Sequence, residues 1–265
     1  MIKAYYRALK MILLALAGVF VGIFFYPRWD GERQRRYIQT WSKKLFKRIG
    51  IKVSVIDEHL LASHSLIVSN HLSWLDIFLI NVAQPSRFIA KESIRSWPLV
   101  GWLATKAGTV YLNRSSARDL RNAFNVLVTS LGQGEHFVFF PEGTSGGTQN
   151  RLLPFHSNLF EAAINAGASI QPCVLHYVDE SNQFHFAIET TEKLGLVQSI
   201  LRVLRSDTIH AKLIILPTIS TAGMQRRELT QVAYDAILEA LSRHEAYKST
   251  DSPTAVSSDL QGTPQ

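Results

Sequence analysis

The feature of this sequence that most constrains its fold is an alternation of short apolar runs with longer amphipathic ones between residues 52 and 243. The short runs are typical of strands, and the longer ones have the spacing of helices. The alternation predicts an α/β fold with a mostly parallel central sheet flanked by helices. The predicted strands are residues 52–56, 65–69, 87–90, 109–112, 136–140, 170–177, 184–189 and 211–216. The predicted helices are residues 73–82, 116–131, 158–166, 194–204 and 225–243.

A long apolar run precedes this alternation. Residues 11–26 carry no charged side chain, and Lys3, Arg7 and Lys10 stand before them. As a helix the run would rise about 24 Å, which is less than the ~30 Å hydrocarbon core of a bilayer. It fits a cleaved signal peptide, a short spanning helix or an anchor that enters one leaflet. The aromatic residues and Pro27 that end the run are unlike a cleavage site, which disfavours the signal peptide.

A basic segment follows at residues 30–49. Helical spacing puts Tyr37, Trp41, Leu45 and Ile49 on one face, among many Lys and Arg residues. Such a helix either lies at an anionic membrane surface or packs on the folded domain with its basic side in water. The formal net charge of +7 is concentrated beside the apolar run, and the sequence has no zinc-finger, RNA-binding or recognition-helix pattern. Membrane lipids are therefore the expected partner, and nucleic acid is not.

We expect the chain to have three parts. Residues 1–50 form a membrane anchor with a basic amphipathic helix, residues 51–245 form the α/β domain, and residues 246–265 form a disordered tail, because the tail has too few apolar residues to fold. Cys173 is the single cysteine, so the chain has neither an internal disulfide nor a multi-cysteine metal site.

The segment NHLSWLD, residues 70–76, is the first candidate for chemistry. It follows a predicted strand and opens a predicted helix, and α/β folds place ligands at such turns. With Asp76 one turn into the helix, its carboxylate can reach back to the ring of His71. One imidazole nitrogen would then be held as a donor, and the other would be left as a base. Alternatively, Asn70 and Asp76 only cap a helix and His71 is structural.

Two further segments carry candidate binding residues. The sequence FFPEGT at residues 139–144 ends a predicted strand, and its glycine and hydroxyl suit the close approach of an anion. Lys91 ends another strand, and Arg114 ends the run GTVYLNR at residues 108–114. Each cation can hold a phosphate, the arginine through two hydrogen bonds. Each feature also occurs without function, as a turn or a surface charge.

Taken in order, these segments resemble the PlsC-type family of 1-acylglycerol-3-phosphate and related lysophospholipid acyltransferases. The resemblance covers residues 67–177. It consists of the N-H-x4-D motif, a strand from Gly108 to Arg114, the F-P-E-G-T motif and an apolar strand that contains Pro172. It implies an α/β domain seated on the membrane by amino-terminal helices.

The resemblance also implies roles for individual residues. His71 is the general base, and Asp76 is its orienting partner. The residues that bind the acceptor are Arg114, Glu142, Gly143 and Thr144; Lys91 stays a further candidate from its place at the end of a strand. His71 would deprotonate a lysolipid hydroxyl as it attacks the thioester of acyl-CoA or acyl-carrier protein, without a metal or a redox cofactor. The candidate walls of an acyl-chain groove are Trp74, Phe78, Trp97 and Trp102.

The chain departs from the family after the E-G-T motif. Many members have arginine at this position, where this chain has Ser145, and Arg151 is a nearby cation that can replace the charge. The acceptor is therefore either 1-acylglycerol-3-phosphate, acylated at its sn-2 hydroxyl to phosphatidate, or another lysolipid such as a lyso-ornithine lipid. Because thioester donors are made in the cytosol, we expect the domain on the cytoplasmic side of the inner or plasma membrane.

Two other classes of protein stay open. The sequence GTSGG at residues 143–147 matches the G-x-S-x-G of a serine hydrolase, with Ser145 as nucleophile and Asp179 and His185 as downstream partners. Against it, the glycines and Pro154 that follow disfavour the helix that a nucleophile elbow requires. A non-catalytic protein that binds anionic lipid would account for the amino-terminal segment and leave the ordered motifs unexplained.

Overall fold

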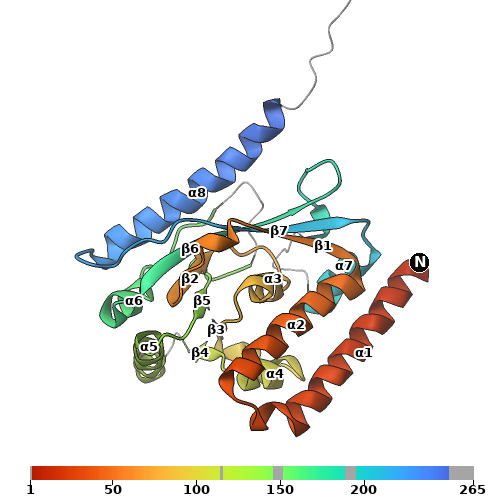
Figure 1. Cartoon of the computed structure of the whole chain (residues 1–265), viewed down its shortest axis with the longest axis horizontal. Helices are drawn as coiled ribbons and strands as arrows, with labels where there is room; N and C mark the ends of the chain where they lie inside the picture. Colours follow the sequence, from red (N-terminus) through yellow and green to blue (C-terminus); the bar gives the residue numbers. More distant parts are fainter. Residues whose placement is uncertain (1, 114–115, 146–151, 189–194, 251–265) are drawn as a thin grey trace, which may run out of the picture.

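The computed structural model contains one seven-stranded sheet with helices on both faces (Figure 1). It describes residues 2–113, 116–145, 152–188 and 195–250, with side chains as far as residue 243. The strands are β1 Ile51–Ile56, β2 Ser65–Ser69, β3 Arg87–Lys91, β4 Val110–Leu112, β5 Phe137–Phe139, β6 Ser169–Val178 and β7 Ile209–Ile215. Their order is β1-β7-β6-β2-β5-β3-β4, and every neighbouring pair is parallel except β6 with β7. The predicted α/β fold with a mostly parallel sheet is confirmed.

The single antiparallel pair reverses the direction of β1 and β7. Val178 at the end of β6 pairs with His210, and Ile51 at the start of β1 pairs with Ile209. The first strand therefore begins at the same edge of the sheet at which β6 and its parallel neighbour β2 end.

Helices cover the two faces of the sheet in separate groups. The α-helices are α1 Ile2–Phe24, α2 Gly31–Ile49, α3 Asp76–Ala83, α4 Val100–Lys106, α5 Ala117–Gly132, α6 Phe160–Ala166, α7 Leu196–Arg205 and α8 Arg226–Thr250. The 3-10 helices are η1 Tyr26–Arg28, η2 Glu58–Leu60, η3 Glu92–Ser96 and η4 Phe186–Ile188. Buried residues of α1, α2, α3 and α7 form the core on one face, and those of α5, α6 and α8 form the core on the other.

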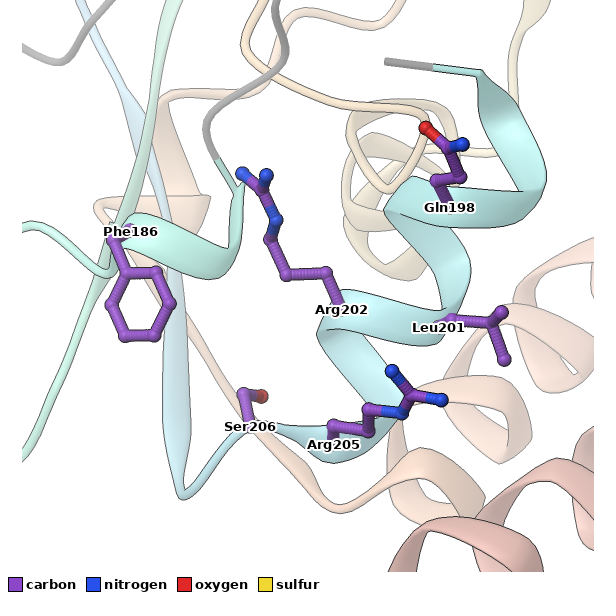
Figure 2. A pocket seen from close by; sticks show the side chains of 6 residues that line it. All are labelled: Phe186, Gln198, Leu201, Arg202, Arg205 and Ser206. Atoms are coloured by element: carbon purple, nitrogen blue, oxygen red, sulfur yellow. The ribbon is translucent and has the colours of Figure 1, made fainter.

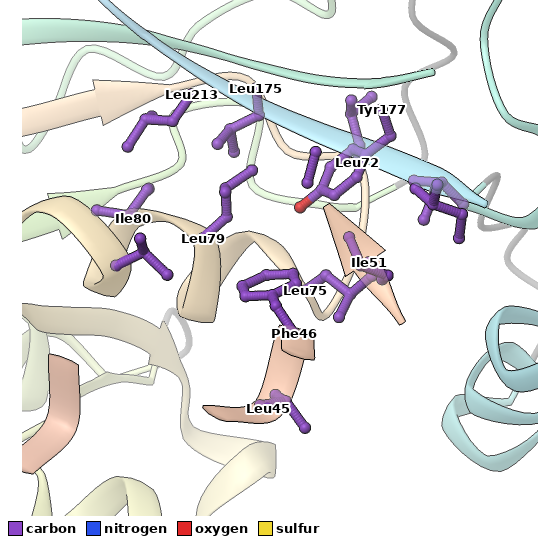
Figure 3. Packing of buried hydrophobic residues seen from close by; sticks show 14 of the residues in the cluster. Leu45, Phe46, Ile51, Leu72, Leu75, Leu79, Ile80, Leu175, Tyr177 and Leu213 are labelled. Carbon is purple, nitrogen blue, oxygen red and sulfur yellow. The ribbon is translucent and has the colours of Figure 1, made fainter. Parts of the chain in front are cut away.

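The segment after β2 is anchored in the first core. Leu75 and Leu79 stand four residues apart, so both side chains lie on the same face of the chain, and both are fully buried. Figure 3 shows them between Phe46 of α2 and Leu175 of the sheet. Each such side chain stabilises the fold by roughly 1.5–3 kcal/mol relative to exposure. This packing fixes the backbone that carries the NHLSWLD motif.

The amino-terminal helices lie side by side, with η1 at the turn between them (Figure 1). Asp30 caps α2 by accepting a hydrogen bond of 2.8 Å from the backbone N–H of Arg33, and Gly50 ends this helix in the left-handed conformation. On α1, a Cβ at Gly18 would lie 2.9 Å from the indole nitrogen of Trp41. Small residues therefore allow α1 to approach α2 closely.

Both ends of α1 are held against the domain. Near its start, the buried Arg7 donates a hydrogen bond of 2.8 Å to the carbonyl of Ser206, just after α7. Near its end, Gly22 lies against Trp102 of α4, because a Cβ there would be 3.1 Å from the ring. Within the described residues, α1 is the helix whose length and composition would allow it to cross a membrane. The exposed large apolar residues of α1 are Ile2, Tyr5, Tyr6, Leu9, Ile12, Leu13, Leu16, Phe20, Ile23 and Phe24.

The elements differ from the prediction in three places. The predicted strand at 184–189 is wrong: Phe184 forms a single bridge with Val178, and the chain then turns into η4, where the ring of His185 accepts a hydrogen bond from the backbone of Ala187. The sequence did not predict α4, because this helix is short and contains a glycine. Helix α8 continues to Thr250, past the predicted end at residue 243, and residues 251–265 lie outside the described part.

Candidate active site

The NHLSWLD segment is fastened to the sheet by its first residue. Strand β2 ends at Ser69, while its neighbour β6 continues beyond that point. The side-chain amide of Asn70 takes the place of the missing strand, because it donates to the carbonyl of Leu175 at 3.0 Å and accepts from the N–H of the same residue at 2.8 Å. Asn70 is therefore a structural residue that satisfies buried backbone groups.

His71 and Asp76 are in direct contact. Nδ1 of His71 lies 2.8 Å from Oδ2 of Asp76, which is fully buried at the first turn of α3. The same oxygen accepts hydrogen bonds from the backbone N–H groups of Leu72 at 2.6 Å and Ser73 at 2.9 Å. An ionised carboxylate only accepts, so this arrangement places the imidazole hydrogen on Nδ1 and leaves Nε2 as the basic nitrogen.

Tyr177 completes the surroundings of Asp76. Its hydroxyl donates to Oδ1 of Asp76 at 2.7 Å from the far end of β6. Burial and the neighbouring carboxylate raise the pKa of Tyr177 well above its ordinary value, so its hydroxyl keeps its proton and remains a donor. The sequence placed this tyrosine at the end of a strand and gave it no role. The available signal was a phenol in a mostly apolar strand, because a buried phenol requires a partner.

The plane of the His71 ring is fixed by stacking. The ring lies on Phe140 with centroids 4.1 Å apart and an angle of 11° between the planes. Its side chain is 20% exposed. Within the described part of the chain, no group hydrogen-bonds to Nε2. The ring is therefore held on one side and offers a free nitrogen on the other.

Glu142 joins the two motif loops. Its Oε1 accepts from the backbone N–H of His71 at 2.8 Å, and its Oε2 accepts from the backbone N–H of Leu153 at 3.0 Å. Burial raises the pKa of Glu142, against the opposing effect of these two hydrogen bonds. Both oxygens are used within the protein, so this carboxylate sets the position of the His71 backbone. Its expected part in acceptor binding stays a prediction.

The other predicted binding residues lie at the carboxyl ends of neighbouring strands. Gly143 follows β5 with φ of 70°, a left-handed conformation that favours glycine, and Thr144 beside it is exposed. Lys91 is exposed at the end of β3, which pairs with β5. We call the edge formed by the carboxyl ends of β2, β5 and β3 the reactive edge, because His71 and Glu142 lie there. Arg114 and Arg151 lie outside the described residues.

Within the described residues, the four side chains predicted to line an acyl-chain groove have separate surroundings. The rings of Trp74 and Phe78 meet edge to face with centroids 6.0 Å apart. Trp102 packs against Gly22 of α1, and Trp97 is exposed.

A surface cavity of about 400 Å³ lies away from these loops, between η4 and α7 (Figure 2). It is lined by Phe186, Gln198, Leu201, Arg202, Arg205 and Ser206. None of these residues comes from the motif segments, so the cavity is not the predicted site.

The residues suggested for a serine hydrolase have local contacts instead. The carboxylate of Asp179 accepts from two backbone N–H groups of the following turn at 2.8 and 2.9 Å. The ring of His185 accepts from the backbone of Ala187. Both side chains therefore serve the local turns, and this weakens the triad that Ser145 would need.

Comparisons with known proteins agree with the motifs. The model of a family described as Acyltransferase matches residues 51–176. A 1-acyl-sn-glycerol-3-phosphate acyltransferase of Neisseria gonorrhoeae is 44% identical over 148 residues, which are 56% of this chain and 57% of that protein. One of Neisseria meningitidis is also 44% identical, over 44% of this chain and 46% of its own length. The chain thus spans about half the length of these two relatives.

Two further matches extend over more of the chain. A lyso-ornithine lipid O-acyltransferase of Pseudomonas aeruginosa is 32% identical over 213 residues, which are 78% of this chain and 79% of that protein. The crystal structure of PlsC, a 1-acyl-sn-glycerophosphate acyltransferase of Thermotoga maritima, superposes with a TM-score of 0.65 at 22% identity, over 91% of this chain and 98% of the other. At this identity the structure supports the fold alone.

Proposed function

Since the chain belongs to the acyltransferase family, we propose that it transfers a fatty acyl group from a thioester donor, acyl-CoA or acyl-carrier protein, to the hydroxyl of a lysolipid. The observation that carries this proposal is the contact of 2.8 Å between His71 and Asp76, with Nε2 of the ring left free at the reactive edge. A hydroxyl is a weak nucleophile, and a positioned base accelerates its attack by about 10²–10⁴-fold.

The proposed reaction has two steps. Nε2 of His71 takes the proton of the acceptor hydroxyl while its oxygen attacks the thioester carbonyl, and a tetrahedral intermediate forms. The carbon–sulfur bond then breaks, and the imidazolium returns the proton to the departing thiolate. Asp76 stabilises the ring while it carries the positive charge, and its own charge is supported by Tyr177 and by the backbone N–H groups of Leu72 and Ser73.

For the acceptor, we propose 1-acylglycerol-3-phosphate, acylated at the sn-2 hydroxyl to give phosphatidate. The names of the two Neisseria relatives support it, at 44% identity. A lyso-ornithine lipid is the second candidate, because the Pseudomonas relative with that name matches 78% of the chain. Ser145, at a position where many members have arginine, favours the second acceptor, and the cation of Lys91 at the reactive edge favours the first.

We propose that the enzyme works at the cytoplasmic side of the inner or plasma membrane. Helix α1 is held at both ends, by Arg7 and by Gly22, and most of its large apolar side chains point away from the domain. This geometry favours a helix that lies in the interface over one that leaves the domain to span the bilayer.

The experiment is acyl transfer from labelled oleoyl-CoA and, separately, from oleoyl-acyl-carrier protein, with lysophosphatidate and lyso-ornithine lipid supplied in parallel. We compare the purified chain with the variant His71→Ala and with the matched variant His59→Ala, which removes an exposed histidine. The label is expected in phosphatidate, with normal rates for His59→Ala and a loss of about 10²–10⁴-fold for His71→Ala. If the label enters ornithine lipid alone, the acceptor is the lyso-ornithine lipid and the proposed chemistry stands. Transfer to neither acceptor would refute the proposal. Reaction of Ser145 with a fluorophosphonate would support the hydrolase instead.

A further inference from the structure

A cluster of exposed apolar side chains stands between η3 and α4. Trp97 is 41% exposed, Leu99 is 46% exposed and Val100 is 40% exposed, with Pro98 between the first two. Single exposed apolar side chains are ordinary on a protein surface, whereas a contiguous group marks a place where something binds. We call residues 97–100 the wedge loop.

The backbone of the wedge loop is strained and firmly held. Leu99 has φ of 63° and ψ of −50°, which a residue with a side chain adopts at a cost in free energy. Two backbone hydrogen bonds of 2.9 Å, from Gly101 to Trp97 and from Leu103 to Leu99, keep the loop in this form. The conformation directs Leu99 to solvent, so burial in the core does not account for the strain.

The wedge loop adjoins both the reactive edge and α1. It follows η3, which begins directly after Lys91, the last residue of β3 at that edge. Helix α4, which the loop begins, contacts the end of α1 through Trp102 and Gly22. The exposed apolar side chains at this end of α1 are Phe20, Ile23 and Phe24, and Phe25 follows the helix. The loop therefore extends the apolar face of α1 toward the reactive edge.

Cations flank the wedge loop in sequence. Lys91 precedes the loop and Lys106 follows it in α4; both are exposed, and the ammonium of Lys106 lies 6.0 Å from the centre of the Trp102 ring. Arg95 precedes the loop and pairs at 3.0 Å with Glu92, the acid closest to it in sequence. An apolar centre with a basic rim complements a bilayer that carries anionic head groups.

We propose that the wedge loop inserts into an anionic phospholipid leaflet beside α1 and holds the reactive edge against the membrane. This inference rests on the proposed function for the choice of a membrane as the surface. The insertion itself is measurable without any acyl transfer.

The test places a fluorescent probe on the wedge loop of the full chain in vesicles of phosphatidylcholine and phosphatidylglycerol. The variant Leu99→Cys carries the probe, Phe20→Cys serves as the reference on α1, and Val232→Cys, at 39% exposure on α8 of the opposite layer, is the matched control. The native Cys173 is buried and burial raises the pKa of its thiol, so it should not compete for the label. Quenching by nitroxide-labelled lipid and by aqueous iodide is then compared for the three positions.

We expect lipid nitroxide to quench the probe at position 99 as it does at position 20, with protection from iodide, and the opposite behaviour at position 232. If the probe at position 99 behaves like the probe at 232 while the probe at 20 is quenched by lipid, then α1 contacts the membrane and the wedge loop does not. This result would overturn the proposal. If lipid nitroxide quenches neither the probe at 99 nor the probe at 20, this face of the molecule does not contact the membrane, and the proposal is overturned. Lipid quenching at 99 in a chain without acyl transfer would keep this inference and refute the proposed function.

A second measurement asks whether insertion matters for substrate supply. The double variant Leu99→Ser and Val100→Ser is compared with Val232→Ser and Leu238→Ser, two apolar residues of similar exposure on α8. We expect the first pair to weaken vesicle binding about tenfold and to slow acylation of bilayer-borne lysolipid in parallel. Activity on a short-chain acceptor dissolved in water should not change. Equal vesicle binding by both pairs, with thermal midpoints near that of the parent, would overturn the proposal.

Discussion

The hydroxyl of Tyr177 and the carboxylate of Asp76 are joined by a hydrogen bond of 2.7 Å, on the oxygen opposite the one that His71 contacts. The phenol therefore shares the negative charge of Asp76 with the imidazole. We infer that Tyr177 acts as a positioning residue, which sets how strongly Asp76 holds a proton on the ring.

The variant Tyr177→Phe should change the pH dependence of the reaction. Without the phenol, more of the Asp76 charge faces the ring, so the protonated ring is stabilised and more alkaline conditions are needed to free the base. We expect the acid limb of kcat/KM against pH to move to higher pH. The control is Tyr234→Phe on α8. It removes a hydroxyl that donates to the carbonyl of Leu152 at 3.4 Å. An unchanged limb in Tyr177→Phe would show that the phenol only fills space.

The variant Glu142→Gln should lower activity through the backbone of His71. A glutamine has one accepting oxygen, so it loses one of the two hydrogen bonds and turns a donor toward a donor. We expect kcat to fall by about ten- to a hundredfold, because the ring moves from its working position. The control is Glu58→Gln, which replaces an exposed carboxylate and should leave kcat unchanged. A normal kcat in Glu142→Gln would mean that the loops are held by other contacts.

Glu142 should also make stability depend on pH. Burial raises the pKa of this carboxyl, so the folded chain binds a proton where the unfolded chain has released it. Its contribution to the free energy of unfolding is therefore full at acid pH and decreases as the pH rises through the raised value. Chemical denaturation of the parent and of Glu142→Gln, which does not titrate, should give a stability advantage for the parent that shrinks from acid to neutral pH. A constant difference would contradict the raised pKa.

Replacement of Gly101 by alanine should destabilise the wedge loop. A Cβ at this position would lie 2.1 Å from the backbone oxygen of Arg95, so the chain has to move. We expect a loss of about 1–3 kcal/mol in the free energy of unfolding. The matched variant Gly132→Ala, where a Cβ meets nothing within 4 Å, should be neutral or stabilising. Equal thermal midpoints for the two variants would show that the loop yields easily.

The variant Arg7→Met should loosen the start of α1. Methionine keeps most of the volume and leaves the carbonyls of Leu204 and Ser206 without this donor. A hydrogen bond from a charged group contributes about 1.5–3 kcal/mol, so α1 should exchange its amide hydrogens faster. The exposed Lys3→Met is the control. Identical exchange in both variants would contradict a role for Arg7 in docking.

The local parts of the site were within reach of the sequence. Strand β2 was predicted with both of its ends, and the contact between His71 and Asp76 follows from their spacing across a strand-to-helix turn. The long-range partners were not. Tyr177 reaches Asp76 because β6 continues past the end of β2, and Glu142 reaches His71 because β5 pairs with β2. Such contacts depend on strand order and register, which spacing along one chain does not encode.

The reversal of β1 and β7 decides at which edge of the sheet the amino-terminal helices join the domain. Because β1 begins where β6 and β2 end, the chain enters the domain from the edge that carries His71, and the helical pair α1 and α2 is delivered to that edge. Had β1 and β7 run parallel to β6 and β2, the same helices would enter from the opposite edge. In the proposed membrane-bound enzyme, strand direction then sets how far His71 stands from the bilayer, and lengthening a surface loop would not alter that distance.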